Sequence, residues 1–353
     1  MSKSIELARP EIRKLVPYSA ANYEDGLVRL NANETPWPAP GSSAEAGLNR
    51  YPPEKPVELT ARLAEYYGVA NDQLLVTRGS SEAIDLLIRC FCEAGKDGIV
   101  ICPPTFGMYR VYADVQGAKV HEIPLEAENG YALNADEIAR NWPDDAKLLF
   151  ICSPNNPTGN SFDTEQIELL AALLSGRAIV VVDAAYAEFS DDAETSKLLD
   201  SPIYDNIVVL RTLSKAFGLA GARCGALLGP ADIVAMMGCV MPPYSISSPV
   251  IETVLASLTP GARAEVARHC DFIRSERERL SAELAKLDGI TEVLPSDANF
   301  LLVKAKDADR CMQLAQQGGV LIRNFGWQLP GCLRITVGET EENDRLLKSL
   351  AKL

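Results

Sequence analysis

Four short apolar stretches, each followed at once by polar residues, constrain the fold of this chain more than any other feature. The stretches are residues 98–102 (GIVIC), 147–152 (KLLFIC), 178–183 (AIVVVD) and 207–210 (IVVL). Short apolar runs rich in β-branched side chains are typical of strands that a sheet buries on both faces. Because helical patterns intervene, most clearly at residues 164–174, we expect an α/β fold whose mainly parallel sheet carries helices on both faces.

The polar residues that follow these strands predict a ligand site. In an open α/β sheet, ligands bind at the carboxyl ends of the strands. Phe106, Asn156, Asp183, Tyr186 and Lys215 each come shortly after a predicted strand. We therefore expect their side chains to meet at one edge of the sheet, although each has an ordinary alternative as a helix cap, a turn residue, a core aromatic or a surface charge.

An anion pocket is predicted beside these residues. Residues 74–77 are predicted to form a further strand. Gly79 is predicted to make a tight turn after it, and a helix is predicted to start at Ser80 or Ser81. A helix N-terminus offers free N–H groups and a positive dipole end, so it can hold a phosphate, although a serine there can also be a simple cap. Three residues around the loop lysine complete the predicted pocket, namely Thr212, Ser214 and Arg223.

This set of groups suits the chemistry of pyridoxal phosphate. The cofactor needs a lysine for its aldehyde and a carboxylate at its ring nitrogen, roles that Lys215 and Asp183 can fill. A neighbouring cation such as Arg223 would lower the pKa of the lysine and free its amine. The remaining predicted contacts are Asn156 and Tyr186 at the ring oxygen and Phe106 on the ring face.

Composition disfavours several other classes of protein. The net charge of −14 argues against a nucleic acid or an anionic membrane as partner and favours small molecules. The nine cysteines lie mostly in apolar runs and only two histidines occur, so we expect reduced core cysteines and no metal site. With no long apolar run and no leader pattern, we expect a cytoplasmic location.

The length of 353 residues predicts about two domains. We expect a large cofactor-binding domain at residues 30–250, and a small α/β domain at residues 251–353 joined by an N-terminal arm, residues 1–29, that lies on another surface. A charged helix at residues 262–287 is expected to bridge the domains with its Arg and Glu side chains in solvent. After it we predict strands at 299–305, 319–323 and 332–338, and helices at 307–317 and 341–352.

Motifs along essentially the whole chain resemble a known family. Residues 153–159 (SPNNPTG), 183–186 (D-x-x-Y), 212–223 (TLSKAFGLAGAR) and 333–338 (LRITVG) are similar to the aspartate-aminotransferase superfamily, fold type I of the pyridoxal-phosphate enzymes. Residues 30–34 (LNANE), 49–52 (NRYP), 102–109 (CPPTFGMY) and 331–339 (GCLRITVGE) resemble the histidinol-phosphate aminotransferase family.

The resemblance implies a homodimer with active sites at the subunit interface. It implies a two-stage exchange through a Schiff base on Lys215. The implied reaction belongs to histidine biosynthesis and interconverts L-histidinol phosphate and 2-oxoglutarate with imidazole-acetol phosphate and L-glutamate. Asp183, Asn156, Tyr186, Ser214 and Arg223 match cofactor contacts. The other contacts that the resemblance implies are Tyr51 from the partner subunit at the cofactor phosphate, Tyr18 near the substrate phosphate, Asn33 at the substrate, and the anion-binding Arg323 and Arg334.

Two departures from the family pattern leave the reaction class intact. Where many relatives have D-E-A-Y, this chain has D-A-A-Y at residues 183–186, which removes a neighbouring acid but keeps Asp183 and Tyr186. Where relatives often carry a tyrosine over the ring, Phe106 keeps the stacking face and loses the hydroxyl.

Other functions stay open at this point. An aromatic-amino-acid aminotransferase and a threonine-phosphate decarboxylase would use the same fold and cofactor. A ligand-sensing regulator would need a basic DNA-binding module, for which the acidic chain has no spare length. A nicotinamide dehydrogenase is disfavoured because no GxGxxG follows a predicted strand with an acidic residue about 20 positions later.

Overall fold

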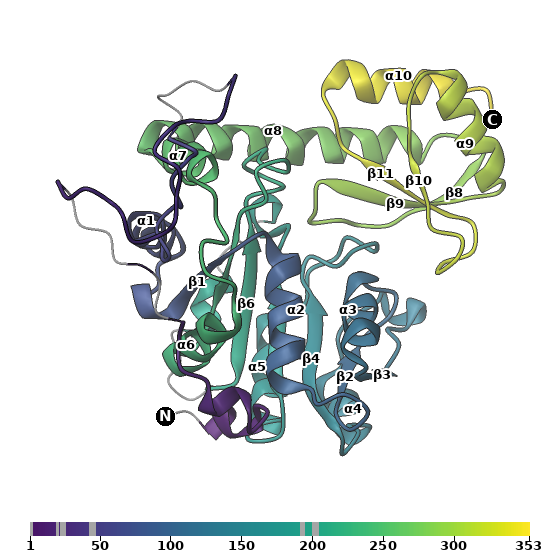
Figure 1. Ribbon diagram of the computed structural model, residues 1–353. Helices are drawn as coiled ribbons and strands as arrows, with labels where there is room; N and C mark the ends of the chain where they lie inside the picture. Colours follow the sequence, from purple (N-terminus) through teal and green to yellow (C-terminus); the bar gives the residue numbers. More distant parts are fainter. Residues whose placement is uncertain (1–2, 19–20, 22–25, 42–46, 191–194, 200–204) are drawn as a thin grey trace.

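Two β-sheets organise the chain in this computed structural model, which describes residues 3–18, 21, 26–41, 47–190, 195–199 and 205–353 (Figure 1). The larger sheet has seven strands in the order β1-β7-β6-β5-β4-β2-β3. Their bounds are β1 (Leu74–Thr77), β2 (Gly98–Ile101), β3 (Lys119–Glu122), β4 (Ala146–Cys152), β5 (Ile179–Asp183), β6 (Ile207–Thr212) and β7 (Gly225–Leu228).

The large sheet is mainly parallel, as the sequence predicts. Strands β3, β2, β4, β5 and β6 run side by side in one direction, so their carboxyl ends share one edge. The unpredicted strand β7 is antiparallel to both of its neighbours, β6 and β1. The prediction of an α/β fold is therefore confirmed, with one reversed strand inserted next to the strand that leads to Lys215.

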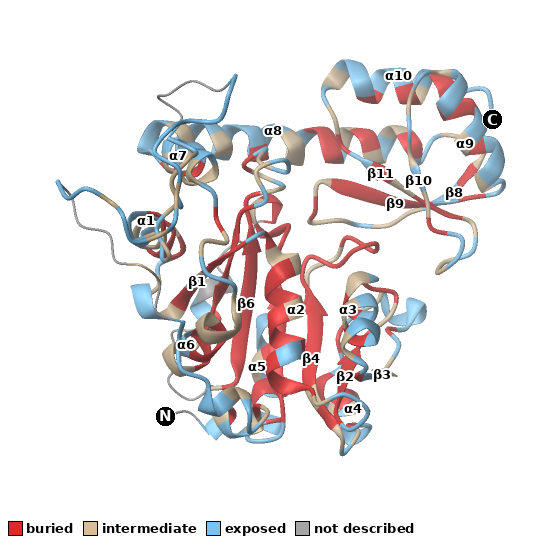
Figure 2. Cartoon of the chain, viewed as in Figure 1, coloured by how far each residue is buried: buried red, intermediate tan, exposed pale blue. Residues whose placement is uncertain are grey.

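Helices cover both faces of this sheet because alternate strand residues point to opposite sides. Leu148 and Phe150 of β4 belong to the core under α2 (Ser80–Phe91), α3 (Met108–Gln116) and α6 (Ala231–Val240). Leu149 and Ile151 face the other core, which is closed by α1 (Val57–Tyr67), α4 (Ala135–Arg140), α5 (Thr164–Leu173) and α7 (Ser248–Ser257). Figure 2 shows that the central strands are buried and that α2 is mostly buried, with partly exposed residues on its outer side.

The smaller sheet is antiparallel, with the strand order β10-β11-β9-β8. It consists of β8 (Ile290–Val293), β9 (Phe300–Ala305), β10 (Arg323–Asn324) and β11 (Cys332–Thr336), and packs against α9 (Ala308–Gln317), α10 (Thr340–Leu350) and the end of α8 (Pro260–Leu284). The strand predicted at residues 319–323 is wrong except for Arg323, because Gly319 adopts a left-handed turn (φ +76°) and pairing with β11 begins only at Arg323. The predicted domain boundaries near residues 30 and 250 stay predictions.

Helix α8 crosses from the large sheet to the small one (Figure 1), and the expectation that its charges are simply solvated is wrong at two positions. Arg277 is buried and donates to the carbonyl oxygens of Phe189 and Ala298, at 3.2 and 2.9 Å. Glu276 is also buried and accepts hydrogen bonds from Arg279 and Asn343. These charges are buried because the helix lies between two packed bodies rather than on a free surface.

The N-terminal segment first packs on its own chain. Two short 3-10 turns, η1 (Lys3–Leu7) and η2 (Ile12–Lys14), lie against the core under α2, where Ala8 is buried and the Arg9 amide donates to the Cys90 carbonyl. All nine cysteines are buried except the half-buried Cys239, which confirms that most of them pack in the core. No helix among the described residues is long and apolar enough to cross a membrane.

Candidate active site

One cavity of about 110 Å³ lies at the carboxyl edge of the large sheet. It is bounded by the ends of β4, β5 and β6, by the loop after β6 and by the first turn of α2. Ten of the predicted site residues line it together, namely Ser80, Ser81, Phe106, Asn156, Asp183, Tyr186, Thr212, Ser214, Lys215 and Arg223, with Cys152 and Ala185 completing the wall. The parallel strands bring these residues into one cavity from five separate segments of the chain.

Asp183 is the last residue of β5 and lies at the floor of this site, 2% exposed. The Tyr109 hydroxyl donates to its Oδ2 at 2.9 Å, whereas Oδ1 has no hydrogen-bond partner among the described residues. Burial raises the pKa of Asp183 to about 6, against the opposing effects of the Tyr109 hydroxyl, the Ala185 amide and Lys215. A buried carboxylate oxygen without a partner is unusual in a folded protein and fits a ligand that donates a hydrogen bond.

Lys215 lies in the loop after β6, open to solvent on one side and to the cavity on the other. Its Nζ is 5.4 Å from the centre of the Tyr186 ring. Partial desolvation lowers the pKa of Lys215, the cations Arg334 and Arg223 add to this effect, and Asp183 opposes it. The environment therefore makes the neutral amine, which is the nucleophilic form, more accessible than it is for a lysine in water.

The start of α2 and the loop after Lys215 form the predicted anion pocket. Gly79, not a serine, is the N-cap of α2, and its φ of +77° is one that side-chain-bearing residues rarely adopt. A Cβ there would lie 2.9 Å from Nη2 of Arg223, so the glycine lets the guanidinium approach the helix start. Arg223 Nη1 and the Thr212 hydroxyl both donate to Ser214 Oγ, at 3.1 and 3.0 Å. Free amides, hydroxyls and a cation thus converge where a phosphate could sit.

The small sheet contributes Arg334 to the same site. Arg334 Nη1 donates to Asn156 Oδ1 at 2.6 Å, and Asn156 Nδ2 lies 3.4 Å from the Tyr186 hydroxyl. The guanidinium lies 5.2 and 5.0 Å from the ring centres of Phe300 and Phe325, which hold it in place. Burial lowers the pKa of Arg334, and the charge of Arg323 lowers it further.

Arg323 and Arg334 are directly opposite each other on β10 and β11. Like charges at paired positions of an antiparallel sheet repel each other, which destabilises the arrangement unless an anion joins them. A guanidinium also binds carboxylates and phosphates through two parallel hydrogen bonds. The pair is therefore suited to an acidic or phosphorylated substrate.

Three predicted residues lie away from the Lys215 cavity of their own chain. Tyr51 is 51% exposed and stacks on Tyr244 with ring centres 4.6 Å apart. Tyr18 is 65% exposed and lies at a second cavity, of about 410 Å³, between α1 and α6. Asn33 is exposed with a φ of +56°. Their assigned roles depend on a partner subunit and stay predictions.

The sequence did not single out three contributors to the site. Tyr109 is fully buried and follows Phe106 by three residues. Its position shortly after the strand predicted at residues 98–102 was the available signal. Phe300 and Phe325 gave no local signal, because they meet Arg334 only through the pairing of β9, β10 and β11.

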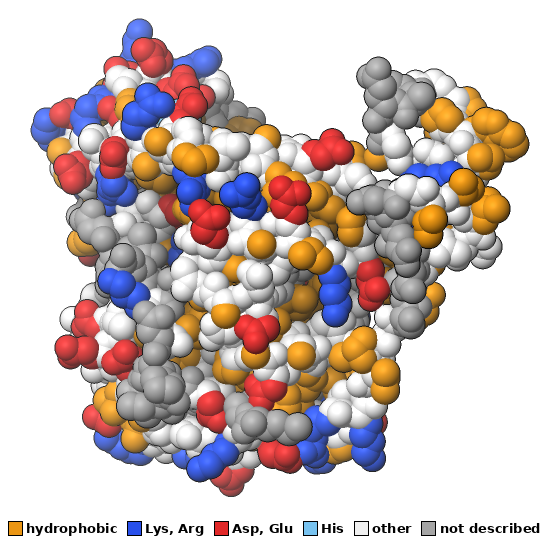
Figure 3. Space-filling model, turned by 90° about the vertical axis from the view of Figure 1, so that its left-hand side faces the viewer, with side chains coloured by type: hydrophobic (Ala, Val, Ile, Leu, Met, Phe, Trp, Pro, Cys, Tyr) orange, Lys and Arg blue, Asp and Glu red, His pale blue; other side chains and the backbone are white. Residues whose placement is uncertain are grey.

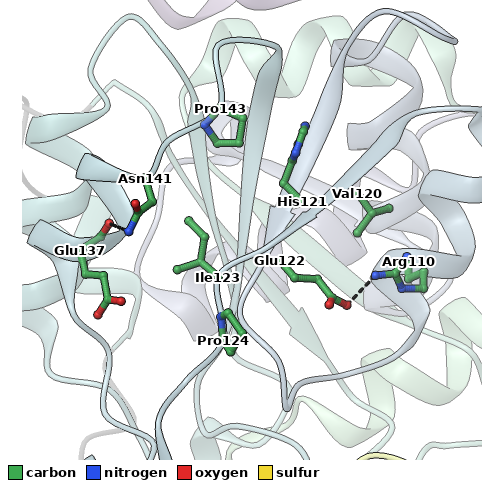
Figure 4. Close-up of a pocket in the computed structure, with 9 residues that line it drawn as sticks. All are labelled: Arg110, Val120, His121, Glu122, Ile123, Pro124, Glu137, Asn141 and Pro143. Carbon is green, nitrogen blue, oxygen red and sulfur yellow. Dashed lines mark hydrogen bonds and ion pairs between the residues drawn. The ribbon is translucent and has the colours of Figure 1, made fainter.

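A separate, more open hollow of about 620 Å³ runs along the edge strand β3 (Figure 4). Two of its polar side chains have partners, since Arg110 Nη2 lies 2.5 Å from Glu122 Oε1 and His121 Nε2 lies 2.8 Å from Asp145 Oδ1. None of its lining residues is a lysine, serine or cysteine, so it lacks the groups that covalent cofactor chemistry requires.

The residues of the Lys215 cavity fit pyridoxal phosphate. The unpartnered Oδ1 of Asp183 can accept a hydrogen bond from a protonated ring nitrogen. Lys215 can hold the aldehyde, and the part of the cavity beside Arg223 and the start of α2 can hold the phosphate.

Solved structures of aminotransferases share this fold. The histidinol-phosphate aminotransferase of Sinorhizobium meliloti, solved in complex with pyridoxal-5'-phosphate, superposes with a TM-score of 0.78 at 22% identity, over 87% of this chain and 83% of that one. That of Clostridium acetobutylicum gives a TM-score of 0.77 at 21% identity, over 87% of this chain and 91% of that one. The prediction of a type I fold is confirmed.

Sequence comparison narrows the family. Residues 21–350 match the family model described as aminotransferase class I and II. The histidinol-phosphate aminotransferase of Xanthomonas euvesicatoria pv. vesicatoria is 41% identical over 99% of this chain and 98% of its own length. That of Xylella fastidiosa is 42% identical over 98% of this chain and 96% of its own length. The chain belongs to the class I and II aminotransferases and, within them, to the histidinol-phosphate aminotransferase family.

Proposed function

We propose that the protein is a pyridoxal-phosphate-dependent transaminase of histidine biosynthesis. It exchanges the amino group between L-histidinol phosphate and 2-oxoglutarate, giving imidazole-acetol phosphate and L-glutamate. The observation that carries the proposal is the single cavity that joins Lys215, Asp183 and the anion pocket of Ser214 and Arg223. Identity of about 41% along nearly the full length to relatives of that name supports this choice of substrate.

The cofactor would be held by groups already arranged around the cavity. Asp183 Oδ1 would accept a hydrogen bond from the ring nitrogen, Asn156 and Tyr186 would contact the ring oxygen, and Phe106 would supply the stacking face. The phosphate contacts are assigned to Ser80, Ser81, Thr212, Ser214 and Arg223. When bound, pyridoxal phosphate supplies an electron-withdrawing ring that stabilises negative charge on the substrate carbon next to the amino group.

Lys215 is assigned two tasks. Its amine would hold the cofactor aldehyde between turnovers, and, once displaced by the substrate amine, it would accept the proton from the substrate α-carbon. The lowered pKa of Lys215 supports both tasks, because a neutral amine can bond to an aldehyde and can accept a proton. The same lysine acts in each half of a ping-pong exchange.

Arg334 and Arg323 are assigned to the substrate acids. Glutamate and 2-oxoglutarate present a carboxylate, and the two imidazole compounds present a phosphate. Since Arg334 contacts Asn156 inside the site and Arg323 pairs with it across the sheet, both kinds of anion would meet the same pair of cations.

We further propose a homodimer in which each subunit completes the other's site. Large apolar side chains are exposed in the N-terminal segment and at the start of α1, including Val28 at 85% and Leu30 at 90%. This segment runs beside α1 and α7, and hydrophobic side chains lie among charged ones on the face seen in Figure 3. Burial of such side chains favours association. A partner would bring Tyr51 to the cofactor phosphate of the opposite cavity, and Tyr18 and Asn33 to its substrate side.

Light scattering of a Val28→Asp, Leu30→Asp double variant tests the dimer. We expect it to shift toward the mass of a monomer, whereas Leu321→Asp, at an equally exposed leucine outside this segment, should leave the mass unchanged. A wild-type protein that already has the mass of a monomer would refute the proposal.

Visible absorption of the cofactor-loaded protein tests the reaction. Histidinol phosphate should rapidly bleach the absorption band of the bound cofactor, and 2-oxoglutarate should restore it. If phenylalanine bleaches the band equally well, the protein is a broader aromatic aminotransferase. If threonine phosphate is consumed with release of carbon dioxide, it is a decarboxylase, and if no band forms, the assignment of Lys215 is wrong.

A further inference from the structure

Tyr109 is an aromatic residue that connects two of the predicted cofactor contacts. It lies in the first turn of α3, and its side chain is 0% exposed. Its ring stacks on Phe150 with centres 4.8 Å apart and meets the ring of Phe106 edge-on at 5.6 Å. These contacts on two sides fix the direction of the phenolic hydroxyl.

The hydroxyl of Tyr109 acts on one oxygen of Asp183 and leaves the other free. It donates to Oδ2 at 2.9 Å, and the buried Oδ1 has no partner among the described residues. Burial, together with the nearby Asp183 charge, raises the pKa of Tyr109 well above its ordinary value. The hydroxyl therefore keeps its proton and remains a donor at neutral pH.

We propose that Tyr109 is a positioning residue for the cofactor ring. Its hydroxyl holds the Asp183 carboxylate with Oδ1 presented to the ring nitrogen, and its ring supports Phe106, the predicted stacking face. The inference rests on the proposed contact between Asp183 and the cofactor. Tyr109 is not among the residues that line the cavity, so it acts through these two neighbours.

A hydrogen bond to a buried carboxylate stabilises its charged form. Without the Tyr109 hydroxyl, Asp183 would hold a proton more tightly, and the proton shared with the ring nitrogen would move toward Asp183. Because the electron-withdrawing power of the ring depends on a protonated nitrogen, the effect would reach the reacting carbon. A residue with only a packing role would not change the protonation of the ring.

The test uses Tyr109→Phe, which keeps the aromatic ring and removes only the hydroxyl. We expect the dissociation constant of pyridoxal phosphate, titrated into cofactor-free protein, to rise about tenfold to a hundredfold, as for one hydrogen bond to a charged group. In the loaded variant, the nitrogen chemical shift of an isotopically labelled cofactor ring should move toward the value of an unprotonated pyridine. Tyr112→Phe, which removes a hydroxyl elsewhere on α3, should change neither quantity.

Asp183→Asn separates failure of this inference from failure of the proposed function. If Asp183→Asn weakens cofactor binding while Tyr109→Phe leaves the dissociation constant and the chemical shift at wild-type values, the role of Tyr109 is refuted and that of Asp183 stands. If Asp183→Asn itself leaves both quantities unchanged, the contact between Asp183 and the ring nitrogen is wrong. Far-ultraviolet circular dichroism and the melting temperature of each variant show whether the fold is retained.

Discussion

Arg334 Nη1 and Asn156 Oδ1 are 2.6 Å apart, and their hydrogen bond joins the small sheet to the large one inside the candidate active site. Arg334 belongs to β11, whereas Asn156 lies in the loop after β4. The group assigned to the substrate and a group assigned to the cofactor are therefore coupled directly. A substitution at Arg334 should therefore also affect the role of Asn156.

Replacement of Arg334 by lysine should impair the use of both acidic substrates. Lysine keeps the charge but loses the planar fork, so we expect the KM values for glutamate and for imidazole-acetol phosphate to rise by roughly tenfold to a hundredfold. A smaller loss in kcat should follow because Asn156 loses its partner. Arg310→Ala, at an exposed position of α9, is the matched control. Unchanged KM values for both substrates would refute the assignment.

Replacement of Lys215 by alanine should abolish turnover without unfolding the protein. We expect kcat to fall by several orders of magnitude, roughly a thousandfold or more, because one side chain serves as both the covalent anchor and the base. Lys286→Ala, which removes a surface lysine paired with Glu283, should retain full activity. Steady-state assays with both variants decide the matter, and near-normal turnover in Lys215→Ala would contradict the mechanism.

Asp183 should make the stability of the cofactor-free protein depend on pH. Its folded pKa of about 6 lies above the ordinary 3.8, so the native state holds a proton there that the unfolded chain has already lost. This contribution to stability is present at low pH and is lost as pH rises through 6, with a cost of about 3 kcal/mol above it.

Asp183→Asn should therefore stabilise the cofactor-free protein in alkaline solution. We expect the free energy of unfolding to rise by roughly 2–3 kcal/mol at about pH 8, and the difference from wild type to become negligible only near about pH 3, below the ordinary pKa of the carboxyl group. Urea unfolding at the two pH values measures both quantities. A difference that is the same at both pH values would show that Asp183 does not titrate in this range.

Gly79→Ala should damage the anion pocket. The left-handed φ of +77° and the 2.9 Å approach of a Cβ to Arg223 both oppose a side chain at this position. We expect pyridoxal phosphate to bind about tenfold or more weakly, since backbone strain of about 1–3 kcal/mol must be relieved by movement of the pocket. Gly221→Ala is the control, because no atom lies within 4 Å of its added carbon. Equal affinity in the two variants would show that the phosphate lies elsewhere.

Arg211 and Glu188 should behave as a buried ion pair in which the effect of each residue on the free energy of unfolding depends on the presence of the other. They are 2.7 Å apart, with side chains only 5% and 7% exposed. Arg211→Met should cost roughly 3–5 kcal/mol because it leaves the Glu188 charge buried without its partner. The double variant Arg211→Met, Glu188→Leu should recover most of this loss. Urea unfolding of the wild type, Arg211→Met, Glu188→Leu and the double variant gives the coupling energy, and additive losses would argue against the dependence.

The parts of the fold that depend on local pattern could be predicted from the sequence. Each central strand is a short apolar run, and each is followed by its site residue, so the parallel arrangement alone brings Asn156, Asp183 and Lys215 into one cavity. The reversed strand β7 has the same apolar character as its parallel neighbours, and nothing in its composition encodes its direction.

The parts that depend on tertiary pairing could not be predicted. Arg277 resembles any charged residue of a surface helix, and only the carbonyl groups of Phe189 and Ala298 make it a buried link. The position of Arg334 between two phenylalanines likewise follows from sheet pairing rather than from its neighbours in sequence. The strand predicted at residues 319–322 failed because apolar character alone does not provide a partner strand.

The position of helix α8 in the sequence affects the order in which the parts of the active site can be completed as the chain is synthesised. All residues assigned to the cofactor in one subunit's cavity precede residue 224 in the sequence. The turn after Tyr186, however, accepts hydrogen bonds from Arg274 and Arg277 of α8, which are synthesised later. Arg334 arrives later still, in the last strand of the small sheet. A growing chain, which emerges N-terminus first, thus contains all the cofactor contacts of its own cavity before it contains the paired arginines assigned to the acidic substrate.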